Sequence, residues 1–185
     1  FIAVGNNGFT NVNAQMIAVW NHDALDNELG LTTQAGITYL DQKANLVLST
    51  ASDLIPGQTS LGQGNNQSIS QSRSRVREFG YFGQIEGNYK DQVIATVGYR
   101  LDKSTLNGDP NKLYGFPKAS LAVNLNNFDF WTSEAINQFK LRGAYGETGS
   151  SAGYGSTFTS LNSTSIGGNG GPTINPSKGD PNIAP

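Results

Sequence analysis

Cysteine is absent from the 185 residues, so neither a disulfide framework nor a thiolate zinc site can form. Charge is also scarce, since 14% of the residues are charged and the net charge is −2. Typical soluble domains contain roughly 25% charged residues. The densest basic cluster is Arg73, Arg75 and Arg77, which is too small for the basic surface of a nucleic-acid-binding protein. We therefore expect no nucleic-acid partner.

Long apolar runs are missing as well. No run approaches 18 residues, which excludes a membrane-spanning helix but leaves spanning β-strands open. Glycine, with 23 residues, and Ser, Thr, Asn and Gln replace the charged residues. This composition favours strands with polar loops over helices. We predict an all-β protein. Because the chain starts at Phe1 without a signal peptide and stops at Pro185 in a loop-like stretch, we also expect it to be a piece of a longer protein.

Alternation of apolar and polar residues with period two predicts six strands. They cover residues 11–20, 31–40, 79–89, 93–104, 119–126 and 139–145. The segment 79–89 alternates most clearly: Phe79, Tyr81, Ile85 and Tyr89 share one face with two glycines. It extends about 33 Å at about 3.3 Å per residue, or about 25 Å along the membrane normal at a tilt of about 40°. That is the height of the apolar band of an outer-membrane barrel, with aromatic residues at both of its borders.

The expected connections differ between the two ends of the sheet. A short turn at 90–92 and intermediate links at 21–30 and 127–138 fall at one end. Long stretches rich in Gly, Ser and Asn, at 44–74, 103–118 and 147–185, fall at the other. Short periplasmic turns opposite long extracellular loops are typical of an antiparallel transmembrane β-barrel.

A soluble β-sandwich remains open at this stage, because its strands alternate in the same way. Such a protein would be a secreted adhesion or carbohydrate-binding module. A small eight-stranded barrel is a third possibility, which is disfavoured because we count six strands and expect none after Ser150. The barrel is favoured by the small number of Lys and Glu residues on the polar faces of the strands and by the uneven distribution of the loops.

Four blocks, in order, resemble a family. They are REFGYFGQIEGNYKD at 77–91, ATVGYRLDKS at 95–104, GFPKAS at 115–120 and KLRGAYGETG at 140–149. They are similar to the barrel of SusC/RagA-type TonB-dependent outer-membrane transporters of Bacteroidetes, and the closing Asn-Ile-Ala-Pro resembles the start of the family's next block. The chain departs from the family at 102–105, where Asp-Lys-Ser-Thr replaces Asp-Gly-Ser-Ser.

The resemblance implies a bacterial outer-membrane protein with a 22-stranded barrel, of which residues 1–185 form about six strands. The plug domain and the remaining strands would lie outside this chain. The resemblance further implies import of glycans (oligosaccharides) or peptides, energy supplied by TonB through an absent N-terminal region, and a SusD-like surface lipoprotein as a lid. It implies contact with outer-membrane lipid, no cofactor and no enzymatic activity.

The candidate site residues lie on the polar face of the predicted strands. They are Gln84, Glu86, Asn88, Arg100, Asp102, Asn124, Lys140 and Arg142. In a barrel they would face the lumen and contact the plug or the substrate path. The favoured alternative is a cross-strand network whose members only satisfy one another. It would be formed by Glu86 and Arg100 or by their neighbours Asn88 and Thr96.

Four aromatic residues fall in predicted loops, namely Tyr114, Phe116, Tyr154 and Phe158. They are loop binding candidates that could stack on sugars, or they are packing anchors. No catalytic motif is present, and no metal site is expected. The lone His22 lacks a partner and falls in a predicted turn, and the alternating oxygens of 107–111 favour a plain turn over a calcium loop.

Overall fold

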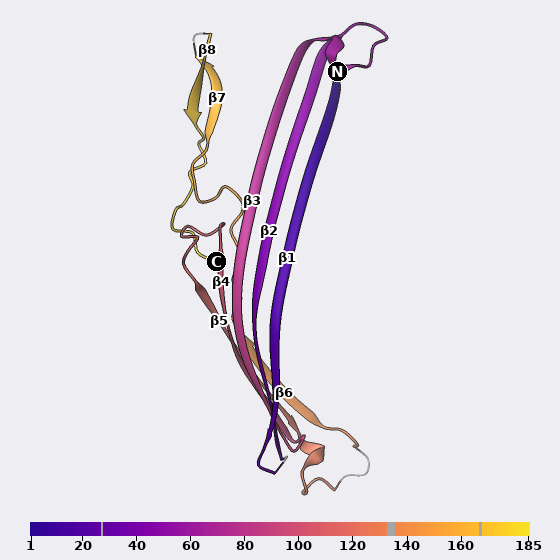
Figure 1. The fold of residues 1–185 in the computed structure, drawn as a ribbon, viewed down its shortest axis with the longest axis vertical. Coiled ribbons are helices and arrows are strands. Elements are labelled where there is room, and N and C mark those ends of the chain that lie inside the picture. The colour runs from indigo at the N-terminus through magenta and orange to yellow at the C-terminus, as the bar shows by residue number, and fades with distance from the viewer. Residues whose placement is uncertain (27, 133–135, 167) are drawn as a thin grey trace. The chain divides into compact units, whose positions relative to one another are not determined.

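The structure is a computed structural model that describes residues 1–26, 28–132, 136–166 and 168–185. Six strands form one sheet in the order of the sequence, and two more form a separate hairpin (Figure 1). The strands are β1 (Ile2–Ala24), β2 (Leu29–Leu54), β3 (Gly64–Tyr89), β4 (Val93–Ser104), β5 (Tyr114–Asn124), β6 (Lys140–Gly146), β7 (Leu161–Ile166) and β8 (Asn169–Ile174). Two 3₁₀ turns are η1 (Leu61–Gln63) and η2 (Leu125–Asn127), and no helix in the described ranges is long and apolar enough to cross a membrane.

The predicted all-β class and the six-stranded sheet are confirmed. The strand predicted at 93–104 coincides with β4, and β3 ends at Tyr89 as expected. The pairs β3–β4, β4–β5 and β5–β6 are antiparallel. The β-branched and aromatic residues that alternate along these strands have high strand propensity, which explains why sequence periodicity located them.

The long loop predicted over 44–74 is wrong. Strand β2 continues to Leu54 and β3 begins at Gly64, so the connection is only residues 55–63. The Ser, Asn and Gln residues of this stretch have the composition of a loop, but strand propensity depends strongly on the neighbouring strands. Here the backbone groups are satisfied by pairing in the sheet rather than by water.

Two other connections are also shorter than predicted, whereas the β5–β6 connection is longer than the predicted 127–138. The β4–β5 connection covers 105–113 and the β1–β2 connection covers 25–28, of which residue 27 lies outside the described residues. The β5–β6 connection, 125–139, is longer than 55–63 or 105–113, and its residues 133–135 also lie outside the described ones. The two ends of the sheet therefore differ less in loop length than the sequence predicted.

The stretch after Ser150 was expected to contain no strand, and this is wrong. Strands β7 and β8 pair in antiparallel register from Leu161 opposite Ile174, and residue 167 between them lies outside the described ones. Glycine, serine and threonine supply most of this hairpin. It therefore lacks the apolar alternation by which the other strands were found.

The chain divides into two compact units, and β1, β2 and β3 contribute residues to both. The first unit consists of residues 1–13 and 40–77. In it, Arg75 donates two hydrogen bonds to the nearly buried Asp41, at 2.9 and 2.6 Å. Gly64 lies close to Ala51: a Cβ added to Gly64 would come within 2.9 Å of the Cβ of Ala51. An ion-paired contact between Arg75 and Asp41 and the close packing of Gly64 on the buried Ala51 therefore both join these strand segments.

The second unit consists of residues 14–39 and 78–185 and contains all the candidate site residues. A three-residue turn in this unit joins β3 to β4. Lys90 and Asp91 have positive φ angles of 50° and 56°, and the Gln92 amide donates to the Tyr89 carbonyl at 2.8 Å. This is the geometry of a type I′ turn, whose twist matches that of the paired strands. The short link predicted at 90–92 is confirmed.

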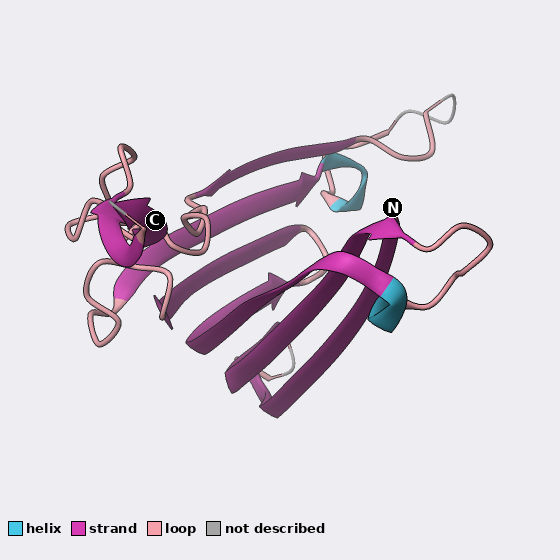
Figure 2. Cartoon of the chain, turned by 90° about the horizontal axis from the view of Figure 1, so that it is seen from above, coloured by secondary structure: helices cyan, strands magenta, loops and turns pink. Residues whose placement is uncertain are grey.

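The sheet is a single layer (Figure 2). Among the described residues, Ala51 is the only buried apolar residue, whereas many large apolar side chains are exposed. A β-sandwich requires a second sheet packed face to face on the first, and the described residues provide only the two-stranded hairpin β7–β8 besides the main sheet. The fold therefore does not resemble a soluble sandwich.

Candidate functional site

The strand register places the eight candidate polar residues on one face of the sheet. Glu86 lies opposite Thr96, and Asp102 lies opposite Gly80. On β5 and β6, Asn124 lies opposite Lys140, and Ala122 lies opposite Arg142. Because directly opposed residues in an antiparallel pair share a face and successive residues alternate, these positions form one polar surface, here called the polar face.

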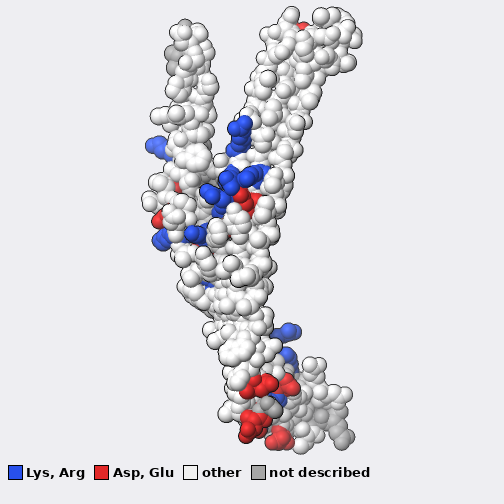
Figure 3. All heavy atoms as spheres, in the orientation of Figure 1, with Lys and Arg blue, Asp and Glu red and all other residues white. Residues whose placement is uncertain are grey.

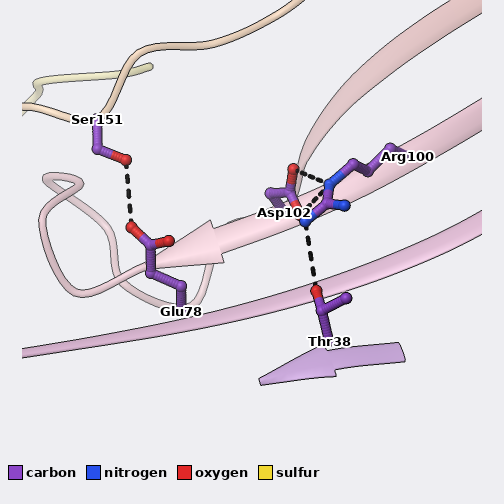
Figure 4. A network of polar contacts seen from close by, with 5 residues as sticks. All are labelled: Thr38, Glu78, Arg100, Asp102 and Ser151. Atoms are coloured by element: carbon purple, nitrogen blue, oxygen red, sulfur yellow. Dashed lines mark hydrogen bonds and ion pairs between the residues drawn. The ribbon is translucent and has the colours of Figure 1, made fainter. Parts of the chain in front are cut away.

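Arg100 and Asp102 form a connected group on the polar face (Figure 4). The Arg100 Nε donates to both Asp102 carboxylate oxygens, at 2.9 and 2.6 Å, and its Nη2 donates to the Thr38 hydroxyl at 3.3 Å. Gly80 makes room for this group, because a Cβ there would lie 2.5 Å from Thr38 Oγ1 and 2.7 Å from Arg100 Nη2. The network links β2 to β4 across β3.

Glu86 and Arg100 do not pair with each other, but Glu86 does bond to Thr96, which was among the expected members of the network. Arg100 lies opposite Phe82 and bonds to Asp102, whereas Glu86 accepts a hydrogen bond from the Thr96 hydroxyl at 3.3 Å. Both charges lie on one face, as predicted, and the register brings each charge beside a nearer partner than the other.

A shallow depression of about 490 Å³ lies where β3, β4, β5 and β6 run side by side. Its polar lining consists of Glu86, Thr96, Ser120, Lys140 and Arg142. Two cations and two hydroxyls thus surround one carboxylate. This donor-rich surface is suited to accept a further anionic group through charge-assisted hydrogen bonds.

Two of the candidates serve a turn instead. Asn88 Nδ2 donates to the Asp91 carboxylate at 2.6 Å and its Oδ1 accepts from the Asp91 amide at 3.1 Å, while Asn124 donates to the Asp91 carbonyl at 2.6 Å. At the same turn, the ammonium of Lys90 lies 2.7 Å from Glu28. The hydrogen bond to Glu28 raises the pKa of Lys90 above its usual value.

Two polar-face residues were missed by the sequence analysis. Glu78 accepts a hydrogen bond from Ser104 at 3.2 Å. It accepts another from Ser151 at 3.3 Å (Figure 4). Lys118 lies across Gly98, whose added Cβ would come within 2.6 Å of the lysine Cε. The parity of Lys118 with Ser120 would have identified it, whereas no sequence signal pointed to the contact of Ser151.

Two of the four aromatic candidates lie in a strand, and the other two lie outside the strands as expected. Tyr114 and Phe116 are not loop residues but lie in β5, opposite Asp102 and Arg100 on the polar face. Tyr154 and Phe158 do lie outside the strands and meet edge to face, with ring centroids 6.4 Å apart. Stacking on a ligand requires an accessible ring face. Both rings are exposed, so each has one available.

The sequence prediction failed for His22 and held for the segment 107–111. His22 is not in a turn but in β1, where it stacks on Trp20 at 5.7 Å. At 107–111, the Asn111 amide donates to the Asp109 carboxylate at 2.9 Å, as in a plain turn. Within the described ranges, no three His, Cys, Asp or Glu side chains gather as metal ligands would.

The opposite face of the same strands is apolar and exposed. Ile85 lies opposite Val97, and the two side chains are 54% and 65% exposed. Leu121, Leu141 and Tyr145 continue this surface on β5 and β6. We call the surface formed by these side chains the apolar face. Figure 3 shows that the Lys, Arg, Asp and Glu side chains visible in that view gather in patches and that most of the surface seen there carries no charged residue.

Proteins similar to this chain are found both by sequence and by fold. A curated TonB-dependent receptor, P26 of Formosa agariphila, is 24% identical over 162 residues, which cover 80% of this chain and 16% of the receptor. The solved RagAB peptide transporter has a TM-score of 0.81 at 16% identity and covers 98% of this chain and 21% of its own. The RagAB peptide importer in the 'closed-closed' state has a TM-score of 0.79 at 16% identity, with 96% and 20% covered. No family model matches the chain.

This chain therefore spans about a fifth or less of the length of the proteins that it matches. The matches confirm its resemblance to SusC/RagA-type TonB-dependent transporters. They also confirm that the sheet has the fold of strands from such a transporter's barrel. The names of the matched proteins are those of a receptor and of transporters, not of enzymes.

Proposed function

We propose that this chain forms part of the barrel wall of an active transporter in the bacterial outer membrane. One observation carries the proposal: a single sheet exposes large apolar side chains on one face and polar ones on the other. Such a sheet is stable when one face contacts lipid and the other lines a polar lumen. Large apolar side chains in water would instead make it prone to aggregation.

The complete transporter, in this proposal, has a 22-stranded barrel filled by an N-terminal plug. It imports oligosaccharides or peptides with energy transmitted by TonB and pairs with a SusD-like surface lipoprotein. Two matches support this proposal. One is a TonB-dependent receptor, and the other is RagAB, which is named as a peptide importer. Residues 1–185 form only a partial barrel domain.

The polar face favours peptides among these substrates. Lys140 and Arg142 line the depression together with Ser120 and Thr96. A peptide carries a terminal carboxylate that such cations bind strongly, whereas a neutral oligosaccharide offers only hydroxyls. A face without cations would have carried no such preference.

The membrane part of the proposal is tested with the full-length protein in cell envelopes. Resistance to alkaline extraction and a heat-dependent shift in gel mobility are expected, because a folded barrel remains compact in detergent without heating. A protein that is released by alkaline buffer and stays monomeric without detergent would instead fit the soluble β-sandwich module and would refute the barrel.

The substrate part is tested by uptake. Cells with a Lys140→Gln/Arg142→Gln double variant should import acid-terminated peptides more slowly, while import of the same peptides with amidated C-termini should change little. Lys118→Gln is the matched control, because Lys118 shares the polar face but does not line the depression. Equal losses for both peptide forms would contradict carboxylate recognition here.

A further inference from the structure

A small groove interrupts the apolar face of β1, β2 and β3. Its volume is about 190 Å³, and it lies within the second unit. The side chains that give it its apolar character are those of Met16, Ile37, Tyr39, Phe79 and Tyr81. The volume corresponds to about six groups of the size of a water molecule or a methylene. The groove is thus wide enough for a stretch of one acyl chain.

One end of the groove is aromatic. The rings of Tyr39 and Phe79 meet with centroids 4.7 Å apart. Aromatic residues of membrane barrels concentrate at the border between hydrocarbon and headgroups. The remaining lining residues would then lie on the hydrocarbon side of this border.

A cation lies at this aromatic end. Lys103 is directly opposite Phe79 in the register, and its Nζ lies 5.4 Å from the centre of the Phe79 ring. In the part of the chain that the structure describes, the Lys103 ammonium makes no ion pair.

We propose that this groove binds one acyl chain of an anionic, phosphate-bearing membrane lipid, with the headgroup phosphate held by Lys103. The inference rests on the proposed function, which places the apolar face in lipid. An unpaired ammonium beside an aromatic border attracts an anionic headgroup, and the groove below it accepts a chain by apolar contact. Neither feature alone would select a particular lipid, but their adjacency matches an acidic phospholipid.

The test uses the full-length protein, purified in a neutral detergent and titrated with phosphatidylglycerol or phosphatidylcholine of identical acyl chains. Native mass spectrometry counts the bound lipids. We expect phosphatidylglycerol to bind about fivefold more tightly, which is the contribution of one lysine near a charged headgroup. Lys103→Gln should abolish this preference, and Ile37→Trp, which fills the groove, should reduce binding of both lipids.

Matched controls separate the site from general effects. Lys112 also lies over an aromatic ring, that of Tyr114, at 5.1 Å, but on the other side of the sheet from the groove. Lys112→Gln should leave the preference intact, and so should Leu141→Trp, which adds bulk to the apolar face outside the groove.

Three results would overturn the inference: equal affinity for both lipids, equal effects of Lys103→Gln and Lys112→Gln, or saturable binding of inorganic phosphate that survives Ile37→Trp. A protein that shows a heat-dependent mobility shift but no lipid preference refutes only this site. A protein that needs no detergent refutes the proposed function itself.

Discussion

Placing a charge at the middle of the apolar face tests which side of the sheet meets lipid. Val97 is 65% exposed and lies opposite Ile85, which is roughly midway between Phe79 and Tyr89 along β3. If those two aromatic residues mark the borders of the hydrocarbon, then Val97 is near the midplane. Val97→Arg would then put a guanidinium where neither water nor a headgroup can reach it easily.

The size of the effect follows from depth. An arginine on the lipid face costs about 2–4 kcal/mol at the midplane and about 0–1 kcal/mol near the borders. Since 1.4 kcal/mol corresponds to a factor of ten, the midplane cost shifts the folding equilibrium about 30- to 700-fold. Val93, which lies opposite Tyr89 on the same face, provides the border position, so Val93→Arg should cost much less.

The assay is reversible unfolding of the full-length protein in lipid vesicles, followed by its mobility without heating. Val97→Arg should shift the unfolding midpoint strongly and Val93→Arg weakly. Thr96→Arg, on the polar face beside Glu86, should be tolerated. Equal destabilisation by Val97→Arg and Thr96→Arg would refute the assignment of the two faces.

Three further outcomes follow from contacts in the second unit. Gly80→Ala should lower stability by about 1–3 kcal/mol, because its methyl group would collide with the Arg100 network; unchanged stability in a urea titration would contradict that crowding. Glu28→Gln removes the partner that raises the pKa of Lys90. At pH 8, below the usual lysine pKa of 10.5, Lys90 is charged, so the variant should be less stable than wild type by the whole contribution of the ion pair. This difference in stability should vanish as the pH rises through the raised pKa of Lys90. A difference that persists in strong alkali would argue against an ion pair. Glu86→Gln should weaken the fold more than it slows uptake, and an uptake defect at normal stability would make Glu86 a substrate contact instead.

Sequence periodicity located the part of the sheet that matters for the proposed function. The alternation of Val93 through Ser104 predicted a strand with the bounds that the structure shows. It worked because β-branched and aromatic residues on one face alternate with polar ones on the other. The same alternation placed Arg100 and Asp102 on one face, since parity along a strand requires no knowledge of its partners.

What periodicity could not supply was pairing. The partner of Glu86 is Thr96 rather than Arg100, because the register is set by the turn at Lys90 and Asp91. Loop-like composition also hid strands wherever backbone pairing outweighed propensity, as at Gly64 and the residues that follow. The contact of Ser151 with Glu78 joins residues far apart in the sequence, and no local pattern encodes it.

The central claim is that one face of this sheet contacts lipid and the other a polar lumen, and nitroxide scanning of β3 tests it most directly. These 185 residues contain no cysteine, so single cysteines at Tyr81, Gln84, Ile85 and Glu86 each carry one label here. In the full-length protein in vesicles, labels at Tyr81 and Ile85 should be relaxed by oxygen, which concentrates in lipid. Labels at Gln84 and Glu86 should respond more to a water-soluble nickel complex. Equal accessibility of all four labels to the nickel complex would contradict the account.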